Sequence, residues 1–158
     1  LSVDGIITTN WDLLLESLFP SYRVFVGQQS IVTQTPQNIG EIYKIHGCCT
    51  DPNSLVLTQE DYDEFDSKRA YLAAKLITIF VEHPVVFLGY SVSDPNIISL
   101  LKAIIRGLGQ AELEKLRDNL IFVQRSKTNR PAGIKETVLV VEDLQLPVMQ
   151  VIADSFDR

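Results

Sequence analysis

Short apolar runs alternate with longer amphipathic stretches along this chain. The runs 5–10, 22–27, 41–47 and 84–91 are rich in β-branched and aromatic residues, which favours strands, and 22–27 is predicted near a sheet edge. The clearest amphipathic stretch covers 96–109, with one helical face made of positions 97, 98, 101, 104, 105 and 108. Strands separated by helices of this length predict a three-layer α/β fold, in which helices cover both faces of a mostly parallel sheet. The almost wholly apolar run 84–91 is typical of a strand covered on both faces.

The first predicted helix covers 11–19. Thr9 or Asn10 can act as its N-cap, because short polar side chains accept hydrogen bonds from the free N–H groups at a helix start. Pro20 ends this helix, since proline cannot continue one. The segment 27–40 is rich in Gln, Thr, Asn, Pro and Gly and is predicted to be a loop.

A capping pattern predicts the next helical region. Thr58 and Asp61 form a T-x-x-D sequence, in which each side chain can bond the other residue's backbone N–H. A helical region is therefore expected over 59–82, with a break near Ser67. The preceding residues 55–58 are expected to be extended.

The last third of the chain is predicted to hold two strands and two helices. Asp94 and Pro95 form an N-cap and first-turn pair that starts the amphipathic stretch. The runs 119–126 and 136–143 are predicted strands, and 146–156 is predicted to be a closing helix with a proline in its first turn.

Polar residues follow three of the predicted strands, at the point where each strand ends. In parallel sheets, ligands bind beyond the carboxyl ends of the strands, so these residues are candidates for one site. The three clusters lie in "TTNWD", "KIHG" and "GYSVSDPN", and their candidate residues are Thr9, Asn10, Asp12, His46, Gly89, Ser91, Asp94 and Asn96.

Each cluster also has a simpler structural interpretation. Asn10 and Asp12 can serve as helix-capping residues, and a single histidine such as His46 is more often structural than catalytic. "GYSVSDPN" can be a turn followed by a cap, and it is neither a G-x-G-x-x-G sequence nor a phosphate-binding loop. Three such clusters in one α/β frame favour a binding site over three unrelated caps.

Charge and composition exclude several classes of protein. The chain has 158 residues, is 46% hydrophobic and carries a net charge of −6. Its basic residues are scattered except for Arg125, Lys127 and Arg130, which argues against a nucleic-acid-binding face. It has neither a signal sequence nor an apolar stretch of roughly 18 residues, so no membrane partner is expected.

The two cysteines, Cys48 and Cys49, are neighbours in the sequence. Adjacent cysteines rarely form a disulfide, because the bond geometry is difficult to reach across one peptide. Without a C-x-x-C pair, the chain cannot supply a four-cysteine zinc site, and we expect no metal. These features fit a reducing, cytoplasmic protein.

Four motifs in this order, "TTNWD", "KIHG", "LVLTQEDYDEF" and "VVFLGYSVSDPNI", resemble the sirtuin-like domains of bacteria, relatives of the NAD-dependent deacetylases. The resemblance covers about residues 3–125, and the last two motifs resemble the prokaryotic sirtuin-like branch. It implies a Rossmann-like, sirtuin-type fold and NAD as the substrate.

The resemblance also implies roles for the first two clusters. Asn10 would contact the nicotinamide ribose or orient the attacking water, and Asp12 would hold the nicotinamide carboxamide. His46 would be the general base, and Thr9 belongs to the same wall of the cofactor site. Asn10 and His46 are therefore the expected catalytic residues.

The third cluster would bind the rest of the cofactor. By the same resemblance, Gly89 and Ser91 would line the phosphate and ribose pocket. Asp94 and Asn96 match the motif of the branch, and Gln124 stands where the family often has a polar residue near the adenosine ribose.

Two departures from the family pattern matter. Deacetylating sirtuins carry a four-cysteine zinc module between the "HG" and "G-x-S" strands, whereas residues 48–88 hold only two cysteines. The family's N-terminal glycine-rich motif also has no match, so we expect the chain to be the C-terminal portion of a larger domain or protein. Alone, it is expected to bind NAD poorly and to be inactive.

These features lead to one expected function and two alternatives. Residues 1–158 are expected to form a single sirtuin-like domain of an NAD+ glycohydrolase that releases nicotinamide in bacterial antiphage defence. The parent protein is expected to form a homo-oligomer and to carry additional domains. The alternatives are a non-catalytic nucleotide-sensing or assembly module and, less favoured by the cysteine count, an NAD-dependent protein deacetylase.

Overall fold

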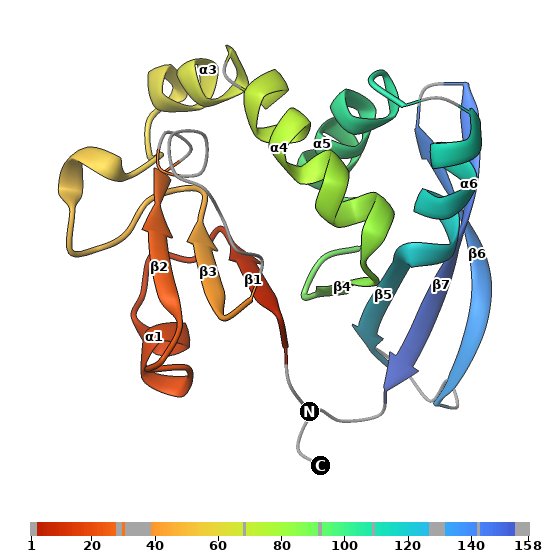
Figure 1. The fold of residues 1–158 in the computed structure, drawn as a ribbon, viewed down its shortest axis with the longest axis horizontal. Helices are drawn as coiled ribbons and strands as arrows, with labels where there is room; N and C mark the ends of the chain where they lie inside the picture. The colour runs from red at the N-terminus through yellow and green to blue at the C-terminus, as the bar shows by residue number, and fades with distance from the viewer. Residues whose placement is uncertain are drawn as a thin grey trace. The chain divides into compact units, whose positions relative to one another are not determined.

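The computed structural model shows an α/β protein in which two compact units follow one another along the chain, Leu1–Lys75 and Leu76–Arg158 (Figure 1). Each unit has its own sheet, and most strand pairs are parallel, as the sequence predicted. The structure describes residues 3–27, 30, 39–67, 69–91, 93–108, 110–126, 132–141 and 143–153. Most of the predicted loop 27–40 lies outside these ranges, as do Lys127 and Arg130.

The sheet of unit 1 has three parallel strands in the order β1-β3-β2. They are β1 (Gly5–Thr8), β2 (Arg23–Val26) and β3 (Glu41–Lys44). The prediction that the second run lies at a sheet edge is confirmed by the position of β2. The central strand β3 is buried along its whole length.

Helix α1 (Leu14–Leu18) is shorter than predicted, and the prediction of Thr9 or Asn10 as its cap is wrong. The backbone N–H of Asn10 donates to the Thr8 hydroxyl at 3.0 Å, which forms a turn before the helix begins. Asp12 instead supplies the acceptor at the helix start, because its Oδ1 accepts from the Leu14 N–H at 2.9 Å.

The predicted helical region after the "HG" motif is confirmed, including its break. A short 3-10 turn, η1 (Pro52–Ser54), leads to α3 (Gln59–Ser67) and then to α4 (Arg69–Glu82). The capping pattern forms as expected: the Asp61 N–H donates to Thr58 Oγ1 at 3.2 Å, and the Thr58 N–H donates to Asp61 Oδ2 at 2.8 Å.

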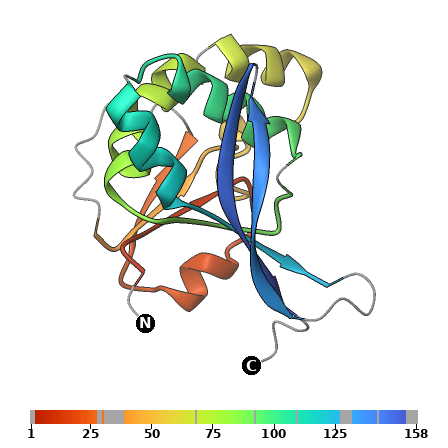
Figure 2. The same ribbon diagram turned by 90° about the vertical axis from the view of Figure 1, so that its right-hand side faces the viewer.

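The sheet of unit 2 has four strands in the order β4-β5-β7-β6. They are β4 (Val85–Leu88), β5 (Leu120–Arg125), β6 (Gly133–Val141) and β7 (Leu144–Ala153). Strands β4, β5 and β7 are parallel, whereas β6 and β7 form the long antiparallel pair that Figure 2 shows in blue (Figure 2).

Helices α5 (Pro95–Ile105) and α6 (Gln110–Asn119) belong to unit 2. The predicted apolar face of α5 is confirmed, since Ile97, Leu101 and Ile104 are buried. The core continues through Phe87, whose ring stacks on that of Phe122 with centroids 4.4 Å apart. Helix α6 was not predicted, because its sequence is mostly polar and Leu116 is its one residue in the buried hydrophobic core of the described residues.

The prediction of a closing helix over 146–156 is wrong, because residues 144–153 form strand β7. Leu146, Val148 and Gln150 are buried, whereas Gln145 and Met149 are exposed, which fits the two-residue period of a strand. Pairing with β5 on one side and β6 on the other outweighs the helical signal of the proline, which stands opposite Val138 in the antiparallel pair.

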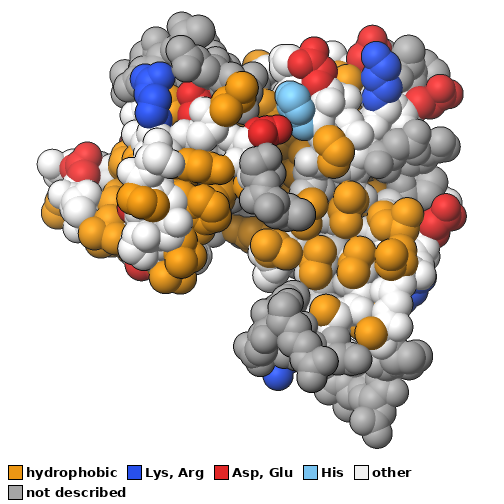
Figure 3. Space-filling model, turned by 60° about the horizontal axis from the view of Figure 1, so that its bottom comes forward, with side chains coloured by type: hydrophobic (Ala, Val, Ile, Leu, Met, Phe, Trp, Pro, Cys, Tyr) orange, Lys and Arg blue, Asp and Glu red, His pale blue; other side chains and the backbone are white. Residues whose placement is uncertain are grey.

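The prediction that β4 is covered on both faces is also wrong. Phe87 is 7% exposed, whereas its neighbours Val86 and Leu88 are 51% and 63% exposed. The same sheet exposes further apolar side chains, and Figure 3 shows them in rows on one face (Figure 3). We call this surface the outer face of the unit 2 sheet; its most exposed members are Val86, Leu88, Ile134, Val138, Val140 and Met149.

Candidate functional site

The loops that follow β1 and β3 are joined by backbone hydrogen bonds. The Ile45 N–H donates to the Thr8 carbonyl at 3.0 Å, and the Cys49 N–H donates to the Trp11 carbonyl at 2.9 Å. Because β1 and β3 are parallel neighbours, both loops leave the sheet at the same edge. The first two predicted clusters, "TTNWD" and "KIHG", therefore lie side by side in unit 1.

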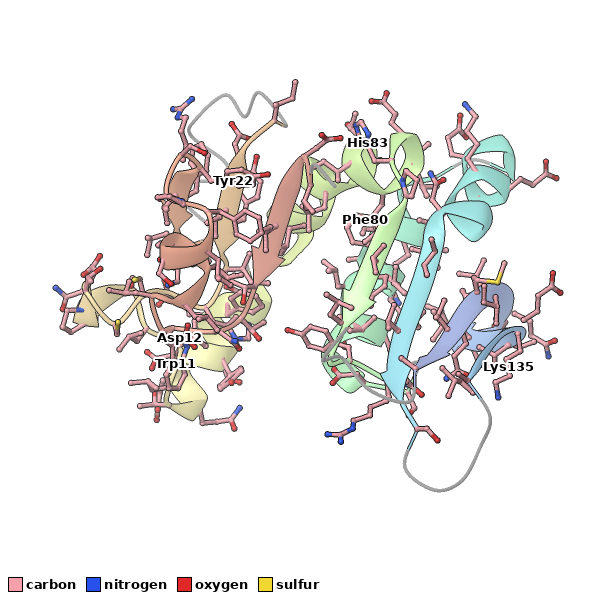
Figure 4. All side chains as sticks on the ribbon, turned by 90° about the horizontal axis from the view of Figure 1, so that it is seen from below. Trp11, Asp12, Tyr22, Phe80, His83 and Lys135 are labelled. Atoms are coloured by element: carbon pink, nitrogen blue, oxygen red, sulfur yellow. The ribbon has the colours of Figure 1, made fainter. Side chains whose placement is uncertain are left out.

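The loop after β1 presents polar side chains to solvent. Asn10 and Asp12 are exposed, and Thr9 is half-buried. Figure 4 labels Trp11 and Asp12 on this loop, just before α1 (Figure 4). The exposed side chains of Asn10 and Asp12 can contact a ligand at this edge of the sheet.

His46 is more enclosed than Asn10 and Asp12 of the loop after β1. It is 7% exposed, and its ring meets two aromatic rings of α3 edge-on. The ring centroids are 4.6 Å apart for Phe65 and 5.8 Å apart for Tyr62. The His46 carbonyl accepts from the Val56 N–H at 3.1 Å. Helix α3 thus fixes the orientation of the imidazole.

Gly47 is required by a close approach of the chain to itself. Its φ is +92°, and a Cβ atom there would lie 2.2 Å from the Ser54 carbonyl oxygen. The 3-10 turn η1 therefore occupies the space that a side chain at position 47 would need. The structure therefore gives this glycine a packing role.

Behind the two loops lies a buried polar cluster that sequence reasoning missed. Lys44 is fully buried, and its Nζ donates to Glu16 Oε1 at 2.7 Å and to the Trp11 carbonyl at 3.3 Å. It also donates to the Asp12 carbonyl. The signal was present in the sequence, because a lysine within a predicted strand must be paired if it is buried.

The Cys48 thiol lies beside the same ammonium. Burial lowers the pKa of Lys44, but hydrogen bonds with Glu16 and Cys48 raise it by more, so the pKa lies above the ordinary lysine value. Burial likewise raises the pKa of the Cys48 thiol, but Thr50, whose hydroxyl donates to Sγ at 3.2 Å, and Lys44 lower it by more. Lys44 therefore stays charged at neutral pH.

The third cluster forms the turn between β4 and α5 in unit 2. Gly89 has a φ of +82°, and a Cβ atom there would meet no atom within 4 Å. Ser91 Oγ lies 3.0 Å from Ser93 Oγ, and the Asp94 N–H donates to the Ser91 carbonyl at 3.1 Å. Asp94 Oδ1 accepts from the Ile97 N–H at 3.3 Å, which confirms the predicted N-cap.

The remaining two candidates also belong to unit 2. Asn96 is the second residue of α5, and its side chain lies outside the described part of the structure. Gln124 lies on β5, one residue beyond the pair Leu88–Val123, and its Oε1 accepts from Gln150 Nε2 at 2.7 Å. The oxygen of Gln124 is thus engaged by the neighbouring strand, and Gln150 is a partner that the sequence did not indicate.

The candidate residues fall into two groups. The first four belong to unit 1 and the other five to unit 2: Thr9, Asn10, Asp12 and His46, and then Gly89, Ser91, Asp94, Asn96 and Gln124. Within the described ranges, three or more His, Cys, Asp or Glu residues do not come together in a way that could hold a metal ion. No helix in those ranges is long and apolar enough to cross a membrane.

Comparison with known proteins supports the resemblance. The model of the SIR2-like domain family matches residues 4–141. The chain is 31% identical over 109 residues, or 66% of its length, to the NAD(+) hydrolase ThsA of Enterococcus faecium. It is 27% identical over 103 residues, or 61% of its length, to the defense-associated sirtuin 2 of Bacillus subtilis.

These relatives are much longer than the chain. The chain spans 23% of the length of the Enterococcus faecium protein and 10% of the Bacillus subtilis protein.

Proposed function

The chain belongs to the SIR2-like domain family, and we propose that its parent protein hydrolyses NAD+ to nicotinamide and ADP-ribose in antiphage defence. The observation that carries the proposal is the joining of the loops after β1 and β3, which groups Asn10, Asp12 and His46 in one unit. Relatives named NAD(+) hydrolase and defense-associated sirtuin support the choice of substrate and setting.

The proposed reaction needs positioning and one proton transfer. Water attacks C1′ of the nicotinamide ribose, the C1′–N bond breaks, and its electron pair leaves with nicotinamide. The attacking water loses one proton, so the products are ADP-ribose, nicotinamide and a proton. A positioned base contributes about 10²–10⁴-fold to such a step.

Asn10, Asp12 and His46 suit the three tasks. The exposed Asp12 carboxylate can accept a hydrogen bond from the nicotinamide carboxamide, and the exposed Asn10 amide can bond the ribose or the attacking water. His46 is the proposed base, and the rings of Phe65 and Tyr62 hold its imidazole in a fixed orientation.

Taken by itself, the turn between β4 and α5 in unit 2 is proposed to bind a ribose. Gly89 leaves open space, so a ligand can approach the backbone there. The Asp94 carboxylate caps α5, which suits hydroxyl groups of a ribose better than a phosphate at that helix end. Ser91 supplies a further hydroxyl on the same turn.

Nicotinamide release by the full-length protein tests the function. Release from NAD+ alone supports a hydrolase, and release only with an acetylated peptide supports a deacetylase. No release under any condition, including addition of phage lysate, would overturn the proposal and favour a nucleotide-sensing module. The enclosure of His46 at 7% exposure is the observation that favours this second candidate.

Two variants with matched controls test the residues. His46→Ala and Asn10→Ala are expected to lower nicotinamide release at least about 100-fold, which is within the range for a lost base or orienting group. His83→Ala and Asn53→Ala serve as controls, because His83 belongs to unit 2 and Asn53 is an exposed residue of η1. Activity at the wild-type level in both site variants would refute the assignment.

A further inference from the structure

The buried Lys44 contacts the loop between the two proposed nicotinamide-binding residues. Among its acceptors are the backbone carbonyls of Trp11 and Asp12, which directly follow Asn10. The third is the Glu16 carboxylate at 2.7 Å, on the helix that the loop enters. One side chain from β3 thus holds both the loop and the start of α1.

Hydrogen bonds with neighbouring residues also hold this loop. Residues 9–13 have no helical or strand structure, and α1 has only five residues. The Asn10 N–H bonds the Thr8 hydroxyl, and the Cys49 N–H shares the Trp11 carbonyl with Lys44. Without the lysine, the Trp11 and Asp12 carbonyls would lose a charged donor, and hydrogen bonds from a charged donor are stronger than neutral ones.

A lysine suits this place better than an arginine. Its ammonium is a compact charge with three donors that can point in different directions, and its acceptors come from a loop and a helix. A guanidinium is planar and larger, so it would not reach the same two carbonyls without moving the loop.

We propose that Lys44 is a positioning residue, which holds the loop 9–12 so that Asn10 and Asp12 face the nicotinamide end of the substrate. The proposal rests on the proposed NAD+ hydrolysis, because it assigns the loop to that substrate. A buried ion pair is weak evidence for stability by itself, since well-packed apolar residues often replace one at no cost. The contacts with the loop give Lys44 a reason to be retained.

The test separates the ion pair from the loop contacts. Glu16→Gln removes the ion pair but leaves the ammonium on the two carbonyls. The double variant Lys44→Met with Glu16→Gln removes both without leaving a lone buried charge. In full-length protein, we expect the kcat for nicotinamide release to stay within about threefold of wild type in Glu16→Gln and to fall about 100-fold in the double variant, the loss typical of a misplaced catalytic group.

Lys44→Arg keeps the charge and provides a second test that remains usable if the double variant does not fold. It is expected to unfold near the wild-type midpoint, yet to lose about tenfold or more in kcat because the loop is displaced. A structural role alone would leave kcat unchanged in this variant.

A second measurement does not depend on turnover. Trp11 is the only tryptophan in the printed sequence, so 5-fluorotryptophan gives a ¹⁹F signal from this loop, assigned by its loss in Trp11→Phe. The signal is expected to shift or broaden in the double variant and to stay unchanged in Glu16→Gln. An unchanged signal in the double variant would overturn the proposal, whatever happens to turnover. A wild-type protein without NAD+ turnover would instead refute the proposed function, and the ¹⁹F signal would still decide whether Lys44 holds the loop.

Discussion

In unit 1, β3 carries Glu41 and Lys44 and is buried along its whole length, whereas in unit 2, β4 is made of four apolar residues, two of which are exposed. Their places in the sheets explain part of the difference. Strand β3 lies between two parallel neighbours, and β4 is at the end of its sheet. Apolar composition therefore does not by itself predict which strand is buried.

The polar groups of β3 are tolerated because they have partners. Lys44 is bonded to Glu16 and to two carbonyls, and on the other face of the strand the Tyr43 hydroxyl donates to Glu41. Burial, together with this bond, raises the pKa of Tyr43 above its usual range. Buried polar groups cost free energy unless they are paired, and these pairs offset that cost on β3.

The largest expected effect on the free energy of unfolding comes from replacing the buried Lys44 of β3. Lys44→Met should lower the free energy of unfolding by about 3–5 kcal/mol, because it leaves the Glu16 carboxylate without its charge partner. Denaturant unfolding gives the value, with Lys102→Met as the control on a half-buried lysine of α5. A loss below about 1 kcal/mol would mean that the cluster relaxes without cost.

Substitutions on the two faces of β4 should differ by nearly as much in the unfolding free energy that they remove. Phe87→Ala removes a ring stacked on Phe122 and should cost about 3–5 kcal/mol, whereas Leu88→Ala should cost less than about 1 kcal/mol because its side chain is exposed. The same unfolding measurement on both variants checks this. Equal costs would show that the outer face is covered in the protein as measured.

Two glycines, one in each unit, allow a matched test of intermediate size. Gly47→Ala and Gly89→Ala both place a side chain at positive φ, which costs about 1–2 kcal/mol. Only the first meets backbone atoms, so Gly47→Ala should be clearly the more destabilising. Thermal unfolding of the pair gives the difference, and equal melting temperatures would contradict the observed approach of Ser54.

The smallest expected effect is the pH dependence of the α3 cap. Hydrogen bonds from Thr58 and Leu57 lower the pKa of Asp61 below its ordinary value of 3.8. The cap therefore stabilises the fold above pH 3.8, and this contribution is lost as the pH falls through the lower folded pKa. Wild type should exceed Asp61→Asn in melting temperature at pH 6, and the gap should narrow as the pH falls below 3.8. A gap that grows on acidification would reverse the assigned sign.

Local signals predicted those parts of the fold that depend on a few neighbouring residues. Thr58 and Asp61 indicated the start of α3, and Asp94 with Pro95 indicated that of α5. Strand β7 was mistaken for a helix, because its apolar run fits both periods and only pairing with β5 and β6 selects the strand.

The candidate site was likewise predictable only where local sequence signals indicate it. The polar residues after β1, β3 and β4 were identified, because they directly follow apolar runs. The contact of Lys44 with Glu16 and the packing of His46 on Phe65 join residues far apart in the sequence, so no spacing rule indicates them. The single domain over 1–158 stays a prediction, as does the assembly of the parent protein.

The approach of Ser54 to Gly47 also affects how related sequences are compared. A relative that has lost enzymatic activity would be free to change His46, yet it would keep the glycine as long as η1 closes against it. The "HG" pair therefore mixes two selective pressures of different origin. If His46 is the base that we propose, the histidine is informative when family members are sorted into active and degenerate enzymes, and the glycine is not.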